Sequence, residues 1–337
     1  MSPSDFIAQA HMRLEAGIPF VLYAEPGATE IKGIFSSGKP AINEFVFAPF
    51  DNGKMLKIPF DRDDVAHATL PSVPTGASAV ANPSGRDEFI GKVERALIEI
   101  GQGRLQKVVL SRAEDIPLAK DRIFEAFARM VNKYAPAFTY CWFHPDSGLW
   151  MGATPERLLR AVGSDFYTMA LAGTMPADDS GHYAWGGKEK AEQRYVTDYI
   201  VEKLRPLAAE IGQHGPVTAQ AGSIVHLKTE ISGVLKPEFA ADDLVRALHP
   251  TPAVCGIPPS QALAFILENE GYDREYYSGY LGICSPGKTD LYVNLRCMKW
   301  QNGTARLFMG CGINHGSDAG CEFEETVNKS ITIKSIL

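Results

Sequence analysis

The stretch YYSGYLGICSPGKTDLYVNLRCMKWQNGTARLFMGCGI, residues 276–313, contains three strand-like apolar runs that are joined by tight turns. Consecutive strands with tight turns between them pair antiparallel, because a parallel partner needs a long crossover connection. Four similar runs, separated by Gly, Pro and Asn, lie between residues 19 and 60 and predict an antiparallel meander. Strands therefore gather in blocks instead of alternating with helices, which predicts an α+β fold with large, mostly antiparallel sheets.

Helices are predicted where apolar residues recur every three or four positions. A helix near 89–101 ends at Gly101, and an N-terminal helix begins with Ser4 as its N-cap and ends at Gly17. The other predicted helices cover residues 121–134, 187–211, 259–270 and 318–336.

The composition is that of an ordinary globular protein. Of the 337 residues, 45% are apolar and 22% are charged, which is enough to bury a sizeable core. The formal net charge of −7 argues against a nucleic-acid binder, which needs a basic surface. No apolar run approaches the roughly 18 residues of a membrane span, and the N-terminus lacks a signal-peptide pattern. We therefore expect a cytoplasmic protein with no membrane contact and, since no coiled-coil heptad appears, a monomer.

The six cysteines, at positions 141, 255, 284, 297, 311 and 321, form no Cys-x-x-Cys pair. A zinc site is disfavoured on this ground. Reduced, mostly buried cysteines are the expected state, as in other cytosolic proteins.

Two carboxylate pairs stand out because each shares a helical face with apolar residues. Glu189 and Glu192 are three positions apart in GGKEKAEQRYVTDYIVEKL (186–204), and Glu322 and Glu325 have the same spacing near the C-terminus. Carboxylates on a core-facing stripe are costly unless they are paired or bind a metal. If the two helices converge, the pairs offer several oxygens to one Mg²⁺ ion. The alternative is that each pair is a solvated first-turn feature favoured by the helix dipole.

Three further residues carry groups suited to catalysis or anion binding. Lys107 opens the strand-like run KVVLS, and an inward lysine near other cations can serve as a general base. Glu156 follows a strand in GATPERLL, where an apolar pocket would keep its carboxyl protonated as an acid. Arg296 lies in the strand-like run LYVNLRCM and, pointing inward, would bind an anion in bidentate fashion. The plain alternatives are an edge lysine, a turn-forming glutamate and a structural ion pair.

Two segments suit the wall of a small cavity. The turn at Gly173 and Thr174 offers backbone N–H groups and a hydroxyl to a carboxylate. The stretch HPTPAVCGIP (249–258), which contains Ala253, has three prolines and is predicted to be rigid and non-helical.

Other residues and motifs are given no catalytic or nucleotide-binding role. His226 and His249 are interpreted as structural histidines. The sequence GCG at 310–312 looks weakly like a dinucleotide-binding loop, but no helix follows it directly and no βαβ unit is evident. A nucleotide-binding fold is therefore rejected.

Taken in order, these segments resemble the chorismate-utilising enzymes, and most closely the isochorismate synthases among them. The resemblance begins at Lys107, extends to the C-terminus and so covers about two-thirds of the chain. Several ordered motifs at compatible spacing are more specific than any one of them. They are KVVLSR, GATPERLL, LAGTMP, KEKAEQRYV, IVHLKTEISG, HPTPAVCGIP, YYSGYLGICSP, LYVNLRC and GCGINHGSDAGCEFEETVNK.

The resemblance implies one chorismate-utilising domain over residues 1–337, in which two large, mostly antiparallel sheets pack together with helices outside. The catalytic core would span 86–337, and the N-terminal part, 1–85, matches the family only weakly. Within that part, residues 71–85 are rich in Pro, Ser, Gly and Ala and are predicted to be a linker or loop.

The resemblance also implies a role for each candidate. Lys107 corresponds to the base that activates water, and Glu156 to the general acid. Glu192 and Glu325 correspond to direct ligands of Mg²⁺, with Glu189 and Glu322 holding its waters. The residues that correspond to substrate-binding groups are Gly173, Thr174, Ala253, Arg296, Gly310 and Lys329.

The implied reaction is Mg²⁺-dependent addition of water at ring C2 of chorismate with loss of the C4 hydroxyl. Its product, isochorismate, feeds menaquinone or siderophore biosynthesis. Lys107 and the AGT sequence at 172–174 argue against the amine-adding relatives. The chain departs from the family at Gln193, where a His often follows the glutamate, and at Tyr280, where a smaller residue is common. Two alternatives stay open: a salicylate synthase, which also eliminates pyruvate, and a non-catalytic metabolite-binding homologue.

Overall fold

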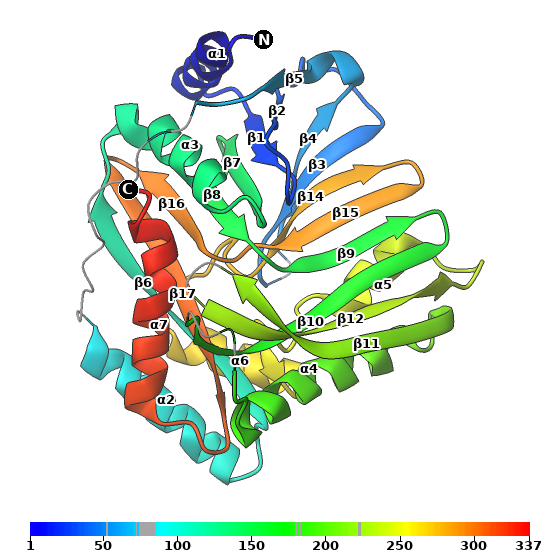
Figure 1. The fold of residues 1–337 in the computed structure, drawn as a ribbon, viewed down its shortest axis with the longest axis vertical. Coiled ribbons are helices and arrows are strands. Elements are labelled where there is room, and N and C mark those ends of the chain that lie inside the picture. The colour runs from blue at the N-terminus through cyan, green and yellow to red at the C-terminus, as the bar shows by residue number, and fades with distance from the viewer. Residues whose placement is uncertain (52, 72, 74–84, 179–180, 182, 222–223) are drawn as a thin grey trace.

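Two β-sheets form the centre of the molecule (Figure 1). The computed structural model describes all residues except 52, 72, 74–84, 179–180, 182 and 222–223. The predicted linker at 71–85 therefore lies mostly outside the described residues. Every strand pairing in the described part of the chain is antiparallel, which confirms the predicted α+β class.

The larger sheet has nine strands and the smaller has eight. In spatial order the first consists of β13 (Gly256–Ile257), β6 (Lys107–Pro117), β17 (Thr304–Asn314), β16 (Cys297–Gln301), β8 (Gly148–Thr154), β7 (Phe138–His144), β1 (Phe20–Ala24), β2 (Ile31–Ile34) and β5 (Val65–Ala68). The second consists of β11 (Ala208–Ala221), β12 (Ile224–Leu235), β10 (Asp165–Pro176), β9 (Arg157–Val162), β15 (Lys288–Val293), β14 (Tyr280–Ser285), β3 (Asn43–Ala48) and β4 (Leu56–Phe60).

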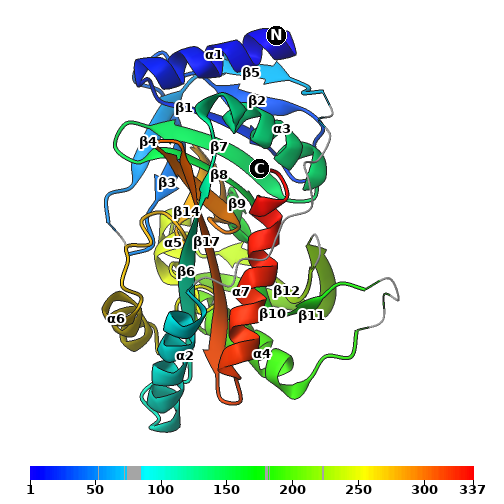
Figure 2. The ribbon, with the colours of Figure 1, turned by 90° about the vertical axis from the view of Figure 1, so that its left-hand side faces the viewer.

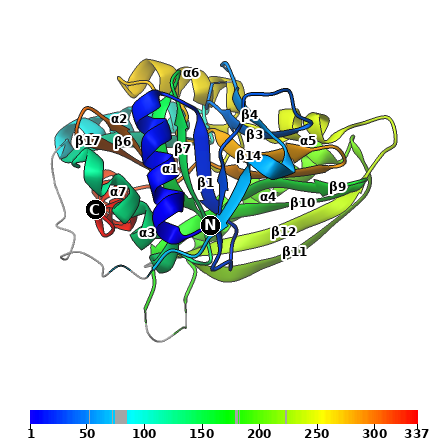
Figure 3. The same cartoon turned by 90° about the horizontal axis from the view of Figure 1, so that it is seen from above.

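Helices cover the outer faces of both sheets, as Figures 1 and 2 show. They are α1 (Pro3–Ala16), α2 (Arg86–Gly101), α3 (Ile123–Lys133), α4 (Gly187–Leu204), α5 (Ala241–Leu248), α6 (Pro259–Asn269) and α7 (Ala319–Lys334), with 3₁₀ turns at Arg62–Asp64 and Lys120–Arg122. Helices α4 and α5 pack on the eight-stranded sheet, and the others pack on the nine-stranded one. Figure 3 shows α1 crossing the end of the molecule where the N-terminus lies.

An aromatic core fills the space between the two sheets. Phe47 from β3 lies 5.2 Å from Trp142 of β7, measured between ring centroids, and Phe138 stacks on Tyr292 of β15 at 4.2 Å. Phe47, Trp142 and Phe138 are each at most 2% exposed. These ring contacts join strands of different sheets, so they set the separation of the two layers.

The strands between residues 19 and 60 do not form one meander as predicted. β1 and β2 belong to the nine-stranded sheet, whereas β3 and β4 belong to the eight-stranded sheet, where β3 pairs with β14. The split buries Phe45 and Phe47 of β3 opposite the aromatic rings of the other sheet. Burial across the layers outweighs pairing with the next strand along the chain.

Two predicted helix boundaries are wrong. The helix predicted over 187–211 ends at Leu204, where Arg205 still has helical dihedral angles but Pro206 has no N–H group to continue the helical hydrogen bonds. The chain then turns into β11, which pairs with β12. At the N-terminus, Ser2 and not Ser4 caps the first helix by accepting a hydrogen bond from the Asp5 N–H group. No helix of the described residues has both the length and the apolar character needed to cross a membrane.

Truncation of the core behind β17 tests the packing of α3 and α7 on the nine-stranded sheet. Leu307 is fully buried, so Leu307→Ala is expected to lower the unfolding free energy by about 2–5 kcal/mol. The control is Leu267→Ala on α6, where the leucine is 63% exposed and a change of at most about 0.5 kcal/mol is expected. Urea denaturation measures both, and equal effects would contradict this description of the core.

Candidate active site

A small cavity of about 80 Å³ lies where the two sheets and helices α4 and α7 meet. Its lining comes from β6, β10, β12, β17, the two helices and the segments that precede β9, β13 and β16. The cavity brings together most of the residues singled out in the sequence. They are Glu156, Gly173, Thr174, Glu192, Ala253, Arg296, Gly310, Glu325 and Lys329.

Lys107 lies immediately behind this lining. Its side chain is fully buried, and its ammonium nitrogen is 3.0 Å from Oε1 of Glu192. Gly312 permits this contact, because a Cβ atom at that position would lie 2.3 Å from Oε1 of Glu192 and 3.0 Å from Cε of Lys107. Any side chain at Gly312 would therefore push Glu192 and Lys107 away from the cavity.

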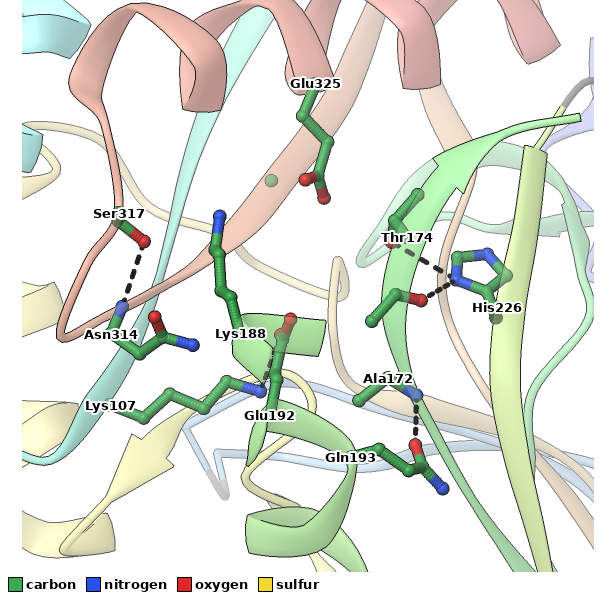
Figure 4. A network of polar contacts seen from close by, with 12 residues as sticks. Lys107, Ala172, Thr174, Lys188, Glu192, Gln193, His226, Asn314, Ser317 and Glu325 are labelled. Carbon is green, nitrogen blue, oxygen red and sulfur yellow. Dashed lines mark hydrogen bonds and ion pairs between the residues drawn. The ribbon is translucent and has the colours of Figure 1, made fainter. Parts of the chain in front are cut away.

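Each of the two carboxylates predicted on α7 forms an ion pair with a lysine. Glu322 pairs with Lys188, and Glu325 lies 2.7 Å from Lys329. Burial alone would lower the pKa of Lys188, but the negative charges of Glu322, Glu325 and Glu192 raise it. Figure 4 shows Lys188, Glu192 and Glu325 pointing into the same space. Lys188 therefore sits among three carboxylates that two helices bring together.

The fourth carboxylate of the predicted set lies apart. Oε2 of Glu189 is 2.6 Å from the place that a Cβ atom on Gly186 would take, so its side chain folds back over the start of α4. Within the described ranges, no group of three His, Cys, Asp or Glu residues is arranged to hold a metal ion. Lysine ammonium groups occupy the positions that a cation would need.

The surroundings shift the pKa values of Glu192 on α4 and Glu322 on α7 in opposite directions. Burial favours the neutral form of Glu192, but the cations of Lys107, Lys329 and Lys188 outweigh it and lower the pKa of Glu192. Burial and the charge of Glu325 raise the pKa of Glu322, against the opposing effect of Lys188. The α4 carboxylate is therefore the stronger anion, and it faces the cavity.

Glu156 behaves differently from these paired acids. It lies between β8 and β9, is 4% exposed and has no ion-pair partner among the described residues. Burial raises the pKa of Glu156 to about 8, even though the charges of Lys107, Lys329 and Arg296 oppose the rise. At neutral pH the cavity therefore contains a carboxylic acid that can donate a proton.

Arg296 is not in a strand, as predicted, but in the crossover from β15 to β16, which belong to different sheets. Its φ of 47° is uncommon for a residue with a side chain and occurs where the surrounding structure enforces it. Burial lowers the pKa of Arg296 to about 10, so it stays charged at neutral pH. The passage of the chain between sheets thus delivers one cation to the cavity.

His226 joins Arg296 to the turn that was predicted to receive a carboxylate. Nη2 of Arg296 lies 2.8 Å from Nε2 of His226, and Nδ1 of His226 lies 3.0 Å from the carbonyl of Gly173 and 3.2 Å from Oγ1 of Thr174. Arginine can only donate, so Nε2 accepts and Nδ1–H donates to the carbonyl. Burial first, and then the positive charge of Arg296, lowers the pKa of His226 well below its ordinary value.

The sequence interpretation assigned His226 a purely structural place and overlooked Lys188. The register of β12 against β10 sets His226 opposite Thr174, which no local pattern shows. Gln193, noted above as a departure from the family, donates to the carbonyl of Ala170 and accepts from the N–H of Ala172. It ties α4 to the strand that carries the Gly173 turn.

A second cavity of about 550 Å³ adjoins the first. The two share Pro155, Leu171, His226 and Arg296, so the contact between His226 and Arg296 forms part of the wall between them. Ligand sites usually measure about 300–1,000 Å³, and the first cavity alone is below that range. A drug-sized or metabolite-sized ligand in the first cavity therefore needs a shift of this wall or of the lysine side chains.

Comparison with known families agrees with this geometry. The family model described as "Chorismate binding enzyme" matches residues 62–337, which is most of the chain. The chain therefore belongs to the chorismate-binding enzymes. This shows the family on which the sequence interpretation rested.

Named relatives lie in one branch of that family. The chain is 31% identical to the salicylate biosynthesis isochorismate synthase of Pseudomonas aeruginosa over 278 residues, covering 79% of this chain and 58% of the relative. It is also 31% identical to isochorismate synthase EntC of Escherichia coli K12 over 263 residues, covering 74% of this chain and 66% of the relative. The chain thus spans between 58% and 66% of the length of these two curated relatives.

Solved structures share the fold. A putative 2,3-dihydroxybenzoate-specific isochorismate synthase, DhbC of Bacillus anthracis, superposes with a TM-score of 0.80 at 24% identity, covering 96% of this chain and 98% of that one. The menaquinone-specific isochorismate synthase MenF of Escherichia coli has a TM-score of 0.79 at 21% identity, with coverages of 95% and 89%. These matches show the two-sheet architecture that the resemblance implied.

Glu156 makes a pH-dependent contribution to stability that can be measured. A carboxyl group that binds its proton more tightly in the folded than in the unfolded chain loses stability as the pH rises from the unfolded pKa to the folded one. Unfolding free energy is therefore expected to fall between about pH 5 and about pH 8, and Glu156→Gln is expected to reduce that fall. Urea denaturation across this range provides the measurement.

The control for this titration is Glu202→Gln, which changes an exposed carboxylate on α4. It is expected to leave the pH dependence as it is in the wild type. If Glu156→Gln gave the same slope as the wild type, the assignment of a protonated Glu156 would be wrong.

Proposed function

We propose that this protein converts chorismate to isochorismate by adding water at ring C2 while the C4 hydroxyl leaves. The observation that carries the proposal is the protonated Glu156 in the same cleft as the fully buried side chain of Lys107. The reaction needs an acid and a base at once, and the cleft offers one of each. The names and family of the relatives support this reaction.

The substrate is a dicarboxylate, and the cleft has the charge to bind it. Arg296 and Lys329 line the cavity as cations, and the Gly173–Thr174 turn lies across from them on β10. In a closed, poorly solvated site, fixed charges and dipoles of this kind hold an anion in one orientation. Arg296 donates a hydrogen bond to His226 in this structure. A substrate carboxylate could take the place of His226 as the acceptor, so the guanidinium would keep a hydrogen-bond acceptor.

The proposed step balances in protons and bonds. Lys107, which must first release its ammonium proton to solvent, takes a proton from water, and the oxygen forms a bond to C2. The two ring double bonds shift, the C4–O bond breaks, and the departing hydroxyl takes the proton of Glu156 as water. Lys107 ends as an ammonium and Glu156 as a carboxylate, so one proton must return from the first to the second before the next turnover.

The donor set fits Mg²⁺, which prefers carboxylate oxygens and keeps several waters. Glu192, Glu322 and Glu325 would hold the ion, because they already surround one cationic group, the ammonium of Lys188. When bound, the ion would supply positive charge to a substrate carboxylate and to Glu192. Glu192 would then bind the ion in addition to contacting Lys107, which is the proposed base.

The alternative product is salicylate, formed when pyruvate is eliminated after isochorismate. One relative is named for salicylate biosynthesis as well as for isochorismate synthesis.

Menaquinone or siderophore biosynthesis would use the isochorismate. We propose that the enzyme is cytoplasmic and monomeric and that its cysteines do not form disulfides.

Turnover of chorismate tests the reaction. The purified protein is expected to form isochorismate without pyruvate in the presence of Mg²⁺, and none after EDTA treatment. Lys107→Ala is expected to lower turnover on the order of a hundredfold or more, since it removes the base. Chromatography identifies the products. Salicylate with pyruvate would favour the alternative, and unchanged chorismate with folded, Mg²⁺-loaded protein would contradict both.

Metal affinity tests the role given to Lys188. Since its ammonium competes for the same three carboxylates, Lys188→Met is expected to bind Mg²⁺ roughly tenfold more tightly, which equals about 1.4 kcal/mol. Lys190→Met, at an exposed position of the same helix, is the matched control and should bind as the wild type does. Isothermal titration calorimetry without substrate measures all three, and weaker binding by Lys188→Met would show that Lys188 helps to build the site.

A further inference from the structure

Asn314 is a buried amide that the proposed mechanism does not yet use. It ends β17, and its side chain is 3% exposed. Neither Oδ1 nor Nδ2 has a hydrogen-bond partner among the described residues. Its backbone, by contrast, is held at both ends, since the N–H group donates to Oγ of Ser317 and the carbonyl accepts from the N–H of Ser317. The residue is therefore firmly placed while its amide is not satisfied.

An unsatisfied amide is costly in a protein interior. Each buried polar group left without a partner costs about 1–3 kcal/mol, and an apolar side chain on this strand would avoid that cost. An asparagine at this place needs a polar partner that the described part of the chain does not supply.

The neighbour of Asn314 in the sheet is Lys107. The two residues are directly paired between β17 and β6, so their side chains lie on the same face of the sheet. The ammonium nitrogen of Lys107 is also fully buried, and among the described residues its ion-pair partner is Glu192, at 3.0 Å. Figure 4 shows the Asn314 amide and the Lys107 ammonium both directed toward Glu192.

We propose that Asn314 and Lys107 together hold the water molecule that is added to the substrate. A buried water typically makes about three hydrogen bonds, and these two side chains offer three polar atoms, of which the two of the Asn314 amide have no partner among the described residues. The site borders the cavity, because Glu192 and Gly312, which both touch Lys107, line it. The inference rests on the proposed function and adds a positioning residue to it.

The amide gives the water an orientation that Lys107 alone does not. The ammonium of Lys107 donates to the water oxygen, and one water hydrogen donates to Oδ1 of Asn314. The second lone pair of the oxygen then faces away from both side chains. A water held at its oxygen and at one hydrogen has its free lone pair directed as well, which shortens the search for the reactive geometry.

Two variants of similar shape separate this role from a structural one. Asn314→Val fills the site with an apolar β-branched side chain, and Asn314→Thr differs from it by a single hydroxyl that can bind water. Both are expected to keep the thermal stability of the wild type or to exceed it, because the unsatisfied amide is removed. A melting curve establishes that both fold.

The kinetic expectation is a loss in kcat and not in KM. Asn314→Val is expected to lower kcat about tenfold or more with KM for chorismate unchanged, and Asn314→Thr to recover much of that loss. Wild-type kcat in Asn314→Val, or equal losses in both variants, would overturn the positioning role. A wild-type protein that does not consume chorismate would remove the proposed function and this role together.

The water site itself is decided independently by crystal structures of the ligand-free wild type and of Asn314→Val. Electron density for one water within hydrogen-bond distance of Lys107 and of the Asn314 amide, lost in the valine variant, is the expected result. Electron density that shows the amide bonded only to protein atoms would overturn the site, whatever the protein does with chorismate.

Discussion

Charge pairing in a poorly solvated cleft is the constraint on which the site depends. Burying a charge is costly unless an opposite charge or a metal accompanies it, and three lysine–glutamate pairs meet that requirement here. The Lys107–Glu192 pair connects β6 to α4, and the Lys188–Glu322 pair connects α4 to α7, although these elements are remote in sequence. The Lys329–Glu325 pair lies within α7. Among the described residues these carboxylates are not arranged to hold a metal ion, and in the proposed function a divalent cation would compete with the lysines for them.

Against this background, the groups without an ion-pair partner in the described cleft are the informative ones. Glu156 responds to burial by keeping its proton, and His226 responds by staying neutral. The first becomes an acid and the second an acceptor for Arg296. Asn314 can respond in neither way, because an amide does not titrate in this range, and a solvent molecule is its remaining option. Glu156 and Asn314 are thereby each linked to one step of the proposed reaction.

Much of the cleft was predictable, because helical spacing and strand ends follow from local chemistry. Glu322 and Glu325 are three positions apart, which places both on one helical face, and of the two interpretations of Glu156 the structure has the buried one. The crossover that carries Arg296 was interpreted as strand, since apolar residues flank it on both sides. Gln193 and His226 act through strand registers, which depend on contacts that single-sequence patterns do not contain.

The sequence by itself determined the α+β class, most helices, the acidic pairs and the family, because periodicity, caps and ordered motifs are local properties. It left open which strands share a sheet, since burial of Phe45 and Phe47 between layers is settled only when both layers exist. It also left open the partners of the buried charges. Lys188 among three carboxylates and Asn314 beside Lys107 are products of packing, because pairing energy depends on distance and burial, which only the folded chain sets.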